Sequence, residues 1–431
     1  MGCGILPPAM NETSPTPSSW SPILPPETAG RALQVVGEIA AALESRPASA
    51  SPAGGPGLAG GTAGLALFFS YLDQARPEEG FDELAMELLE EAVTATAESP
   101  LLPSLYSGFS GVGWIMEHLR GRLYEDEEGE DSGEEVAAAL AEHVGITPWL
   151  GHYDLISGLV GFGVYARERL PRSGGKECLR RVVERLSELA EHGPHGATWL
   201  TGPGLMPQRE VDLFPAGSYN LGLAHGVPGV IALLGVAQES GIESQPLLDD
   251  AVAWLLAQKL PADEESVFGY SVAAGVEQGS SRVAWCYGDL GIAASLLVAA
   301  RAIGESDWER EALAITHRAA ARSLESSGVI DAGLCHGAAG VAHLFNRLHQ
   351  ATGDPALGDA ARRWIDQTLA LRTPGVGIGG YQMWVPDEDR NLGWRDDPGF
   401  LTGSLGVGLA LLAAATEVEP EWDRVLQVSP L

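Results

Sequence analysis

The chain has 431 residues, a hydrophobic content of 45% and a formal net charge of −32. So large an excess of acidic groups repels nucleic acids and anionic membrane surfaces, and both are excluded as partners. Four cysteines are too few for a disulfide framework in a chain of this size, so we expect reduced thiols and a cytoplasmic location.

The first 28 residues are rich in Pro, Ser and Thr and show no hydrophobic periodicity, which predicts a flexible tail. They also lack the basic flank and apolar core of a secretory signal. Residues 29–431 are predicted to form a single domain. Nowhere does this domain contain an apolar run long enough for an integral membrane segment.

Two kinds of helical pattern alternate along the domain. Amphipathic segments place apolar side chains at i, i+3, i+4 and i+7, with acidic residues on the other face, and are predicted to be outer helices. They fall near residues 30–45, 81–93, 134–145, 176–192, 246–258, 308–323 and 356–370. Segments that are apolar almost all round, such as 64–72 and 406–415, are predicted to be inner helices. The acidic run 125–135 is predicted to be a solvated loop.

Every apolar segment begins with a Gly-x-x-Gly pair, and the pairs recur at intervals of 47 to 68 residues. This spacing accommodates two helices and their loops in each repeat. The seven pairs are Gly61/Gly64, Gly108/Gly111, Gly158/Gly161, Gly226/Gly229, Gly288/Gly291, Gly337/Gly340 and Gly403/Gly406. Glycine at a helix start permits close backbone approach where the inner helices converge. A closed ring buries all the inner helices, so we predict an all-α fold, an α/α toroid of seven inner and seven outer helices.

The residues just before each glycine pair occupy equivalent positions at the rim of the predicted barrel. These positions hold Cys286 in the fifth repeat and Cys335 and His336 in the sixth. Two thiolates and an imidazole suit zinc, and three protein ligands leave one coordination position open, as in catalytic zinc sites. The alternative is two buried structural cysteines and a core histidine. The shared register favours a site for one Zn²⁺ ion per chain.

Three further side chains are candidates near this site. His225 immediately precedes the fourth glycine pair and is a candidate for proton transfer. Asp154 is a candidate to orient that histidine or to raise its pKa, and helix capping is its alternative role. Arg282 is a candidate to stabilise a developing oxyanion, whereas a lone arginine is otherwise a surface charge.

Three motifs, in this order, resemble the signature of the lanthionine synthetase C-like family. They are Ala224-His-Gly226, Trp285-Cys-Tyr-Gly288 and Cys335-His-Gly337. Together with the glycine pairs, the resemblance covers residues 30–416. It implies a seven-fold α/α barrel with one catalytic zinc ion, whose ligands match Cys286, Cys335 and His336.

The resemblance also implies roles for other residues and a reaction. His225 matches the acid/base and Asp154 its partner, while Arg282 and Tyr287 match residues that line the site. In the family, zinc lowers the pKa of a peptide cysteine, which adds to a dehydroalanine or dehydrobutyrine of the same peptide. The product is a lanthionine or methyllanthionine ring, so the resemblance implies a zinc-dependent lanthionine cyclase of lanthipeptide biosynthesis.

The expected substrate is a dehydrated precursor peptide. The chain has no room for the dehydratase region of the two-function synthetases, so we expect a separate dehydratase and an exporter as partners. Three alternatives stay open: addition of glutathione to dehydroamino acids, as in mammalian-type members; a non-catalytic zinc-binding scaffold; and an α/α-barrel glycosidase. A glycosidase needs two carboxylates across one cleft, and only Asp154 and Asp289 stand near the rim.

Overall fold

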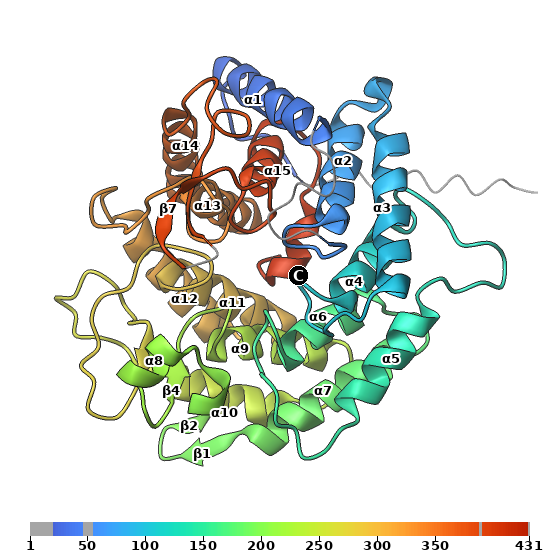
Figure 1. The fold of residues 1–431 in the computed structure, drawn as a ribbon. Helices are drawn as coiled ribbons and strands as arrows, with labels where there is room; N and C mark the ends of the chain where they lie inside the picture. The colour runs from blue at the N-terminus through green and yellow to red at the C-terminus, as the bar shows by residue number, and fades with distance from the viewer. Residues whose placement is uncertain (1–19, 46–54, 388–389, 430–431) are drawn as a thin grey trace, which may run out of the picture.

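The computed structural model describes residues 20–45, 55–387 and 390–429, and helices in these ranges form two concentric rings (Figure 1). The inner ring consists of α2 (Thr62–Ala75), α4 (Phe109–Leu119), α6 (Leu159–Glu168), α9 (Val227–Glu239), α11 (Asp289–Ile303), α13 (Ala338–Thr352) and α15 (Ser404–Ala415). The outer ring consists of α1 (Pro26–Glu44), α3 (Phe81–Glu98), α5 (Glu134–Val144), α7 (Gly175–Leu189), α10 (Gln245–Leu256), α12 (Ser306–Ala320) and α14 (Pro355–Ala370). The predicted α/α toroid is confirmed.

The two ends of the chain close the ring. The outer helices α3 to α14 each pack on the inner helix that precedes them in the chain, whereas α1 packs on α15 (Figure 1). Helix α15 also contacts both α13 and α2, so it has neighbours on all sides. Every residue of α15 from Ser404 to Ala414 is buried. This closure explains why the inner helices are apolar all round.

The glycine pairs shape the start of each inner helix. In all seven pairs the first glycine is the N-cap residue, and the second lies within the first turn. A Cβ atom on the second glycine would clash with the carbonyl oxygen six residues earlier, as Gly291 would with Trp285 and Gly340 with Leu334. The predicted close approach is therefore present. The nearest backbone belongs to the rim loop of the same repeat, which folds over its own helix.

Backbone hydrogen bonds join the rim loops of neighbouring repeats. The amide N–H of Ala224 donates to the carbonyl oxygen of Cys286 at 3.4 Å, that of Cys286 to Cys335 at 3.3 Å, and that of Cys335 to Leu401 at 2.7 Å. The first and second repeats are joined at the same position. Residues at one position of the repeat are thereby placed side by side in space, although a whole repeat separates them in the sequence.

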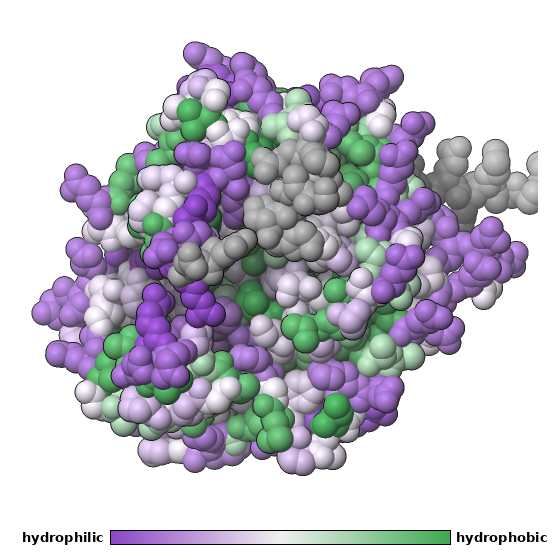
Figure 2. Space-filling model, viewed as in Figure 1, coloured by the Kyte–Doolittle hydropathy of each residue, from purple (hydrophilic) through white to green (hydrophobic). Residues whose placement is uncertain are grey.

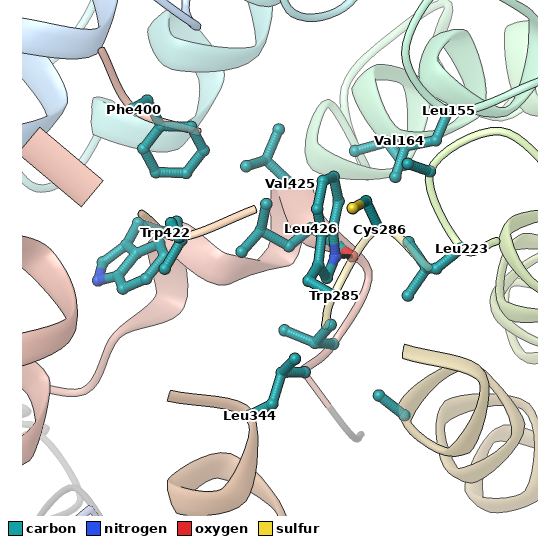
Figure 3. Packing of buried hydrophobic residues seen from close by; sticks show 14 of the residues in the cluster. Leu155, Val164, Leu223, Trp285, Cys286, Leu344, Phe400, Trp422, Val425 and Leu426 are labelled. Carbon is teal, nitrogen blue, oxygen red and sulfur yellow. Dashed lines mark hydrogen bonds between the residues drawn. The ribbon is translucent and has the colours of Figure 1, made fainter. Parts of the chain in front are cut away.

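The 3-10 helix η4 (Glu421–Leu426) fills the centre of the inner ring (Figure 1). The indole N–H of Trp285 donates to the carbonyl oxygen of Leu426, and the hydroxyl of Tyr106 donates to that of Val425, both at 2.9 Å. Figure 3 shows Trp285 lying between Cys286 and Leu426. The rim loops that carry the candidate site therefore rest on a packed floor.

Part of the predicted tail packs on the barrel. The buried indole of Trp20 donates to the carbonyl oxygen of Ala413 at 2.9 Å, the amide of Ile23 donates to Ala414 at 3.0 Å, and α1 begins at Pro26. The flexible tail predicted for residues 1–28 stays a prediction only for residues 1–19, which lie outside the described residues. Among the described helices, none is long and apolar enough to cross a membrane.

The acidic run 125–135 is partly held against the barrel. The buried guanidinium of Arg169 donates to Asp131 at 2.5 Å, and Arg172 lies 3.1 Å from Asp126. Arg120 also pairs with Asp126. The prediction of a solvated loop is therefore wrong for these two aspartates, because buried arginines need anionic partners and the nearby run supplies them.

Short strands, none of which was predicted, occur in the rim loops. β1 (Glu191–Gly193) and β2 (Gly196–Thr198) form a hairpin after α7, and Glu191 pairs with Thr198. β3 (Leu200–Thr201), β4 (Ser218–Asn220) and β5 (Ser271–Val272) form an antiparallel sheet. Between β3 and β4 lie η3 (Pro203–Leu205) and α8 (Gln208–Leu213). β6 (Met383–Pro386) and β7 (Leu392–Arg395) form a hairpin before α15, and η2 (Pro77–Glu79) precedes α3.

Candidate functional site

The structure brings the three predicted metal ligands together. The ligand atoms of Cys286, Cys335 and His336 all lie within 4.8 Å of one another at the rim of the fifth and sixth repeats. The two cysteines meet because the backbone hydrogen bond between them, at 3.3 Å, aligns their rim loops. His336 follows Cys335 directly and reaches the same point. The Cys286 side chain is buried, and the other two are partly buried.

The chemistry of this cluster suits a zinc ion. A hydrogen bond from Cys335, together with one from His336, holds the pKa of the Cys286 thiol well below its usual value. One sulfur atom of the pair therefore carries negative charge readily, as a metal ligand must. Two sulfur ligands and one nitrogen ligand match a catalytic zinc site, in which a fourth position remains for a substrate atom. The residues present fit that ion.

His225 and Asp154 form a hydrogen-bonded pair beside the cluster. The Nδ1 atom of His225 lies 2.6 Å from Oδ2 of Asp154, and the backbone N–H of Ser157 donates to Oδ1 at 2.8 Å. Asp154 therefore contacts the histidine as predicted and also holds its own rim turn, but it does not cap a helix, since the N-cap of α6 is Gly158 and receives no side-chain hydrogen bond. Burial lowers the pKa of His225, but the hydrogen bond and charge of Asp154 outweigh burial and raise that pKa. Because the carboxylate accepts a hydrogen bond from the Nδ1–H group, the Nε2 atom of His225 is left for other partners.

A cavity of about 630 Å³ adjoins this pair. One wall belongs to the barrel rim and includes Asp154, His225 and Tyr287. The facing wall belongs to the insertion between α7 and α9 and includes Met206 and Glu210. Figure 2 shows one face of the molecule, on which hydrophilic residues predominate and apolar residues are interspersed among them. The insertion thus adds a second wall to the rim and makes it a cavity that stays open to solvent on one side.

Tyr287 and Arg282 complete the predicted set. The hydroxyl oxygen of Tyr287 accepts a hydrogen bond from Asn220 at 2.9 Å, and its ring centroid lies 6.3 Å from that of His225. Burial raises the pKa of Tyr287 to about 12, so the phenol stays protonated at neutral pH. Arg282 makes no ion pair with a carboxylate within the described ranges, and its charge contributes to lowering the pKa of Cys286. Its backbone N–H donates to Tyr270 at 3.1 Å.

Some contacts at the site were not foreseen. Asn220 binds Tyr287, and the sequence carried a signal for it, since an Asn or Asp stands six residues before the glycine pair in three repeats. Tyr270 and Glu210 lie in rim loops outside the repeat register, which offers no signal for them. Asp289 is fully buried, and its carboxylate accepts the backbone N–H groups of Val267 and Phe268. It is therefore a structural residue and not the second catalytic carboxylate that the sequence offered for a glycosidase.

The geometry defines a class of protein: a seven-repeat helical toroid whose rim carries a Cys-Cys-His cluster and, beside it, a His-Asp pair in a cavity. The chain belongs to the lanthionine synthetase C-like protein family, whose model matches residues 52–427. The resemblance seen in the rim motifs is thereby confirmed.

Curated proteins and solved structures are similar to the chain. The nisin biosynthesis protein NisC of Lactococcus lactis subsp. lactis is 26% identical over 319 residues, which are 68% of this chain and 74% of that protein. The probable SapB synthase of Streptomyces coelicolor is 44% identical over 86 residues, which are 20% of this chain and 8% of that protein. The structure of nisin cyclase superposes with a TM-score of 0.70 at 19% identity, covering 93% of this chain and 98% of that one. The chain is thus homologous to NisC over most of its length.

Proposed function

We propose that the protein is a zinc-dependent lanthionine cyclase that closes thioether rings in a dehydrated precursor peptide. The observation that carries the proposal is the meeting of the Cys286, Cys335 and His336 cluster with the His225–Asp154 pair at one rim. A metal site with an open position and a proton-transfer pair are the two parts that thiol addition needs. Homology to a nisin biosynthesis protein supports the same reaction.

Cys286, Cys335 and His336 would hold one zinc ion per chain. When bound, zinc supplies a Lewis acid that lowers the pKa of a peptide cysteine thiol, so that the thiolate exists at neutral pH. Trp285 and η4 support the ligand loop from below and exclude water from that side. A rigid floor keeps the ligands in place while the peptide enters from the cavity.

The protein's own residues would then transfer the thiol proton and stabilise the negative charge that forms on the carbonyl oxygen. The thiol of the peptide loses a proton, its sulfur bonds to the β-carbon, and the electron pair of the carbon–carbon double bond moves toward the carbonyl oxygen. His225, held at Nδ1 by Asp154, takes the thiol proton at Nε2 and returns it to the α-carbon. Tyr287, which lines the cavity, and Arg282, whose charge acts on Cys286, would stabilise the negative charge on that oxygen.

The substrate requires prior loss of water from serine or threonine residues of the peptide. As part of this proposal, a separate dehydratase carries out that step before the peptide reaches this protein. The modified peptide would pass from that enzyme to the rim cavity, and its export would follow ring closure.

The zinc content of the purified protein tests the proposal first. Elemental analysis under reducing conditions is expected to find one zinc ion per chain in the wild type and little in Cys335→Ala. The matched control is Cys178→Ala, which removes a buried thiol from α7 and should leave the zinc content unchanged. Absence of zinc from the wild type, prepared without chelator, would contradict the proposal.

Ring closure is then measured on a model peptide that contains one cysteine and one dehydroalanine. Cyclisation leaves the mass unchanged but removes the free thiol, so a cyclised peptide no longer reacts with iodoacetamide. The wild type is expected to remove the reactive thiol and Cys335→Ala to leave it. A glutathione adduct in place of the ring, when glutathione is also supplied, would support the intermolecular reaction instead.

A further inference from the structure

Asn220 is held in one orientation by two different partners. Its Oδ1 atom accepts the backbone N–H of Gly222 at 2.8 Å, and its Nδ2 atom donates to the hydroxyl oxygen of Tyr287 at 2.9 Å. A backbone N–H can only donate, so the oxygen of the amide must face Gly222. The NH₂ group must then face Tyr287, and a flipped amide would lose the bond to Gly222.

The same turn recurs in two later repeats with an aspartate in place of the asparagine. Asp331 and Asp397 also stand six residues before a glycine pair and two residues before a glycine. Their Oδ1 atoms accept the backbone N–H of Gly333 at 3.0 Å and of Gly399 at 2.7 Å. An aspartate therefore forms this turn as well as an asparagine does.

The second side-chain atom distinguishes the three residues. The Oδ2 atom of Asp331 accepts the backbone N–H of Trp384 at 3.0 Å, and that of Asp397 accepts the hydroxyl of Thr402 at 2.6 Å. In both aspartates, therefore, the Oδ2 atom accepts a hydrogen bond. Only the fourth repeat has an asparagine here, and only there does the second atom donate, to Tyr287. The presence of asparagine and not aspartate at position 220 is therefore explained by the hydrogen bond to Tyr287, since the turn forms with either residue.

Tyr287 is fixed at its ring as well as at its hydroxyl group. A Cβ atom on Gly222 would lie 2.7 Å from Cδ1 and 2.8 Å from Cε1 of Tyr287, so the absence of a side chain lets the ring lie against the turn. The hydroxyl oxygen already accepts from Asn220, and no acceptor for its hydrogen is found within the described residues. Tyr287 lines the cavity beside His225. Its hydrogen is therefore available to a molecule in that cavity.

We propose that Asn220 is a positioning residue for ring closure: by donating to Tyr287, it leaves the phenol hydrogen to be donated to the carbonyl oxygen of the dehydroamino acid. This inference rests on the proposed cyclase activity and adds a residue to it. A carboxylate at position 220 would accept the phenol hydrogen itself, and the substrate oxygen would lose its donor. No bond is made or broken at Asn220, whose effect passes wholly through Tyr287.

The variant Asn220→Asp tests this inference, because Asp331 and Asp397 show that the turn survives the change. We expect a kcat lower by about 100-fold, the lower end of the loss that removal of one oxyanion donor causes. KM, zinc content and the helical circular dichroism signal should stay near wild-type values. Tyr287→Phe should lower kcat by a similar factor, and Asn220→Asp should have no further effect in that background.

Two results would overturn the inference. One is wild-type kcat in either single variant. The other is an equal loss from Asn220→Asp with and without Tyr287, which would indicate a structural role for Asn220 that does not pass through the phenol. The proposed function fails separately, if wild-type protein loaded with zinc leaves the peptide thiol reactive, and the inference then fails with it.

Discussion

Replacement of Asp154 by asparagine would change which nitrogen of His225 carries the proton. The backbone N–H of Ser157 donates to one oxygen of Asp154, so the amide oxygen of an asparagine would accept that same hydrogen bond. The amide NH₂ would then face Nδ1 of His225, which would have to become an acceptor. The neutral ring would carry its proton on Nε2 and could no longer take the thiol proton there.

The size of the effect follows from the geometry of the pair. A hydrogen bond that involves a charged group contributes about 1.5–3 kcal/mol, which corresponds to about 10- to 150-fold in rate. The Asp154 side chain is 7% exposed, but that of His225 is 42% exposed, so solvent screens part of the interaction. We therefore expect kcat to fall by about 10- to 30-fold, in the lower part of that range.

The pH dependence of kcat/KM gives a second readout. Asp154 raises the pKa of His225 against the effect of burial, so its loss lets burial lower that pKa. The limb of the profile that reports His225 should move to lower pH. Asp249 on α10 is exposed, so Asp249→Asn is the control for a lost negative charge and should change neither the rate nor the pH profile. An unchanged kcat and pH profile in Asp154→Asn would refute the role of this pair.

Four other substitutions have expected outcomes. Cys286→Ala should abolish zinc loading and ring closure while the circular dichroism of the helices persists, and ring closure by the metal-free variant would contradict the site. Asp423→Asn leaves Arg347 buried without its carboxylate and should lower the free energy of unfolding in urea by about 3–5 kcal/mol. Asp423 has a lowered pKa, caused by Arg347 and His343 despite burial, so its contribution is present above its unfolded pKa and is lost as the pH falls. Gly340→Ala should unfold at lower urea concentration and bind less zinc, whereas Gly30→Ala in the open middle of α1 should stabilise the protein by about 0.5–1 kcal/mol.

The repeat and its register were readable from the sequence because both depend on local properties. Helical periodicity separates the inner from the outer helices, and glycine marks the positions where the rim loop approaches its own helix. Once the glycine pairs are aligned, Cys286 and Cys335 share one position in neighbouring repeats. The backbone bond that joins them follows from ring closure, so the cluster could be predicted without coordinates.

The rim insertions were not readable, since strands of two to four residues have no periodicity to detect. The wall that η3 and α8 provide, and with it the cavity, appears only when the loops pack. The pairing of Asp126 with Arg120 and Arg172 could not be predicted either, because composition alone suggests a solvated run.

The sequence by itself thus determined the helical toroid and the metal-ligand positions, because local periodicity and a repeating register specify both. Only the tertiary structure decided which side chains turn toward one another: His225 toward Asp154, and Asn220 toward Tyr287. These pairs join residues of different repeats through hydrogen bonds whose direction depends on neighbouring backbone groups. A linear pattern does not contain that information, since a hydrogen bond is specified by the positions of both partners in space.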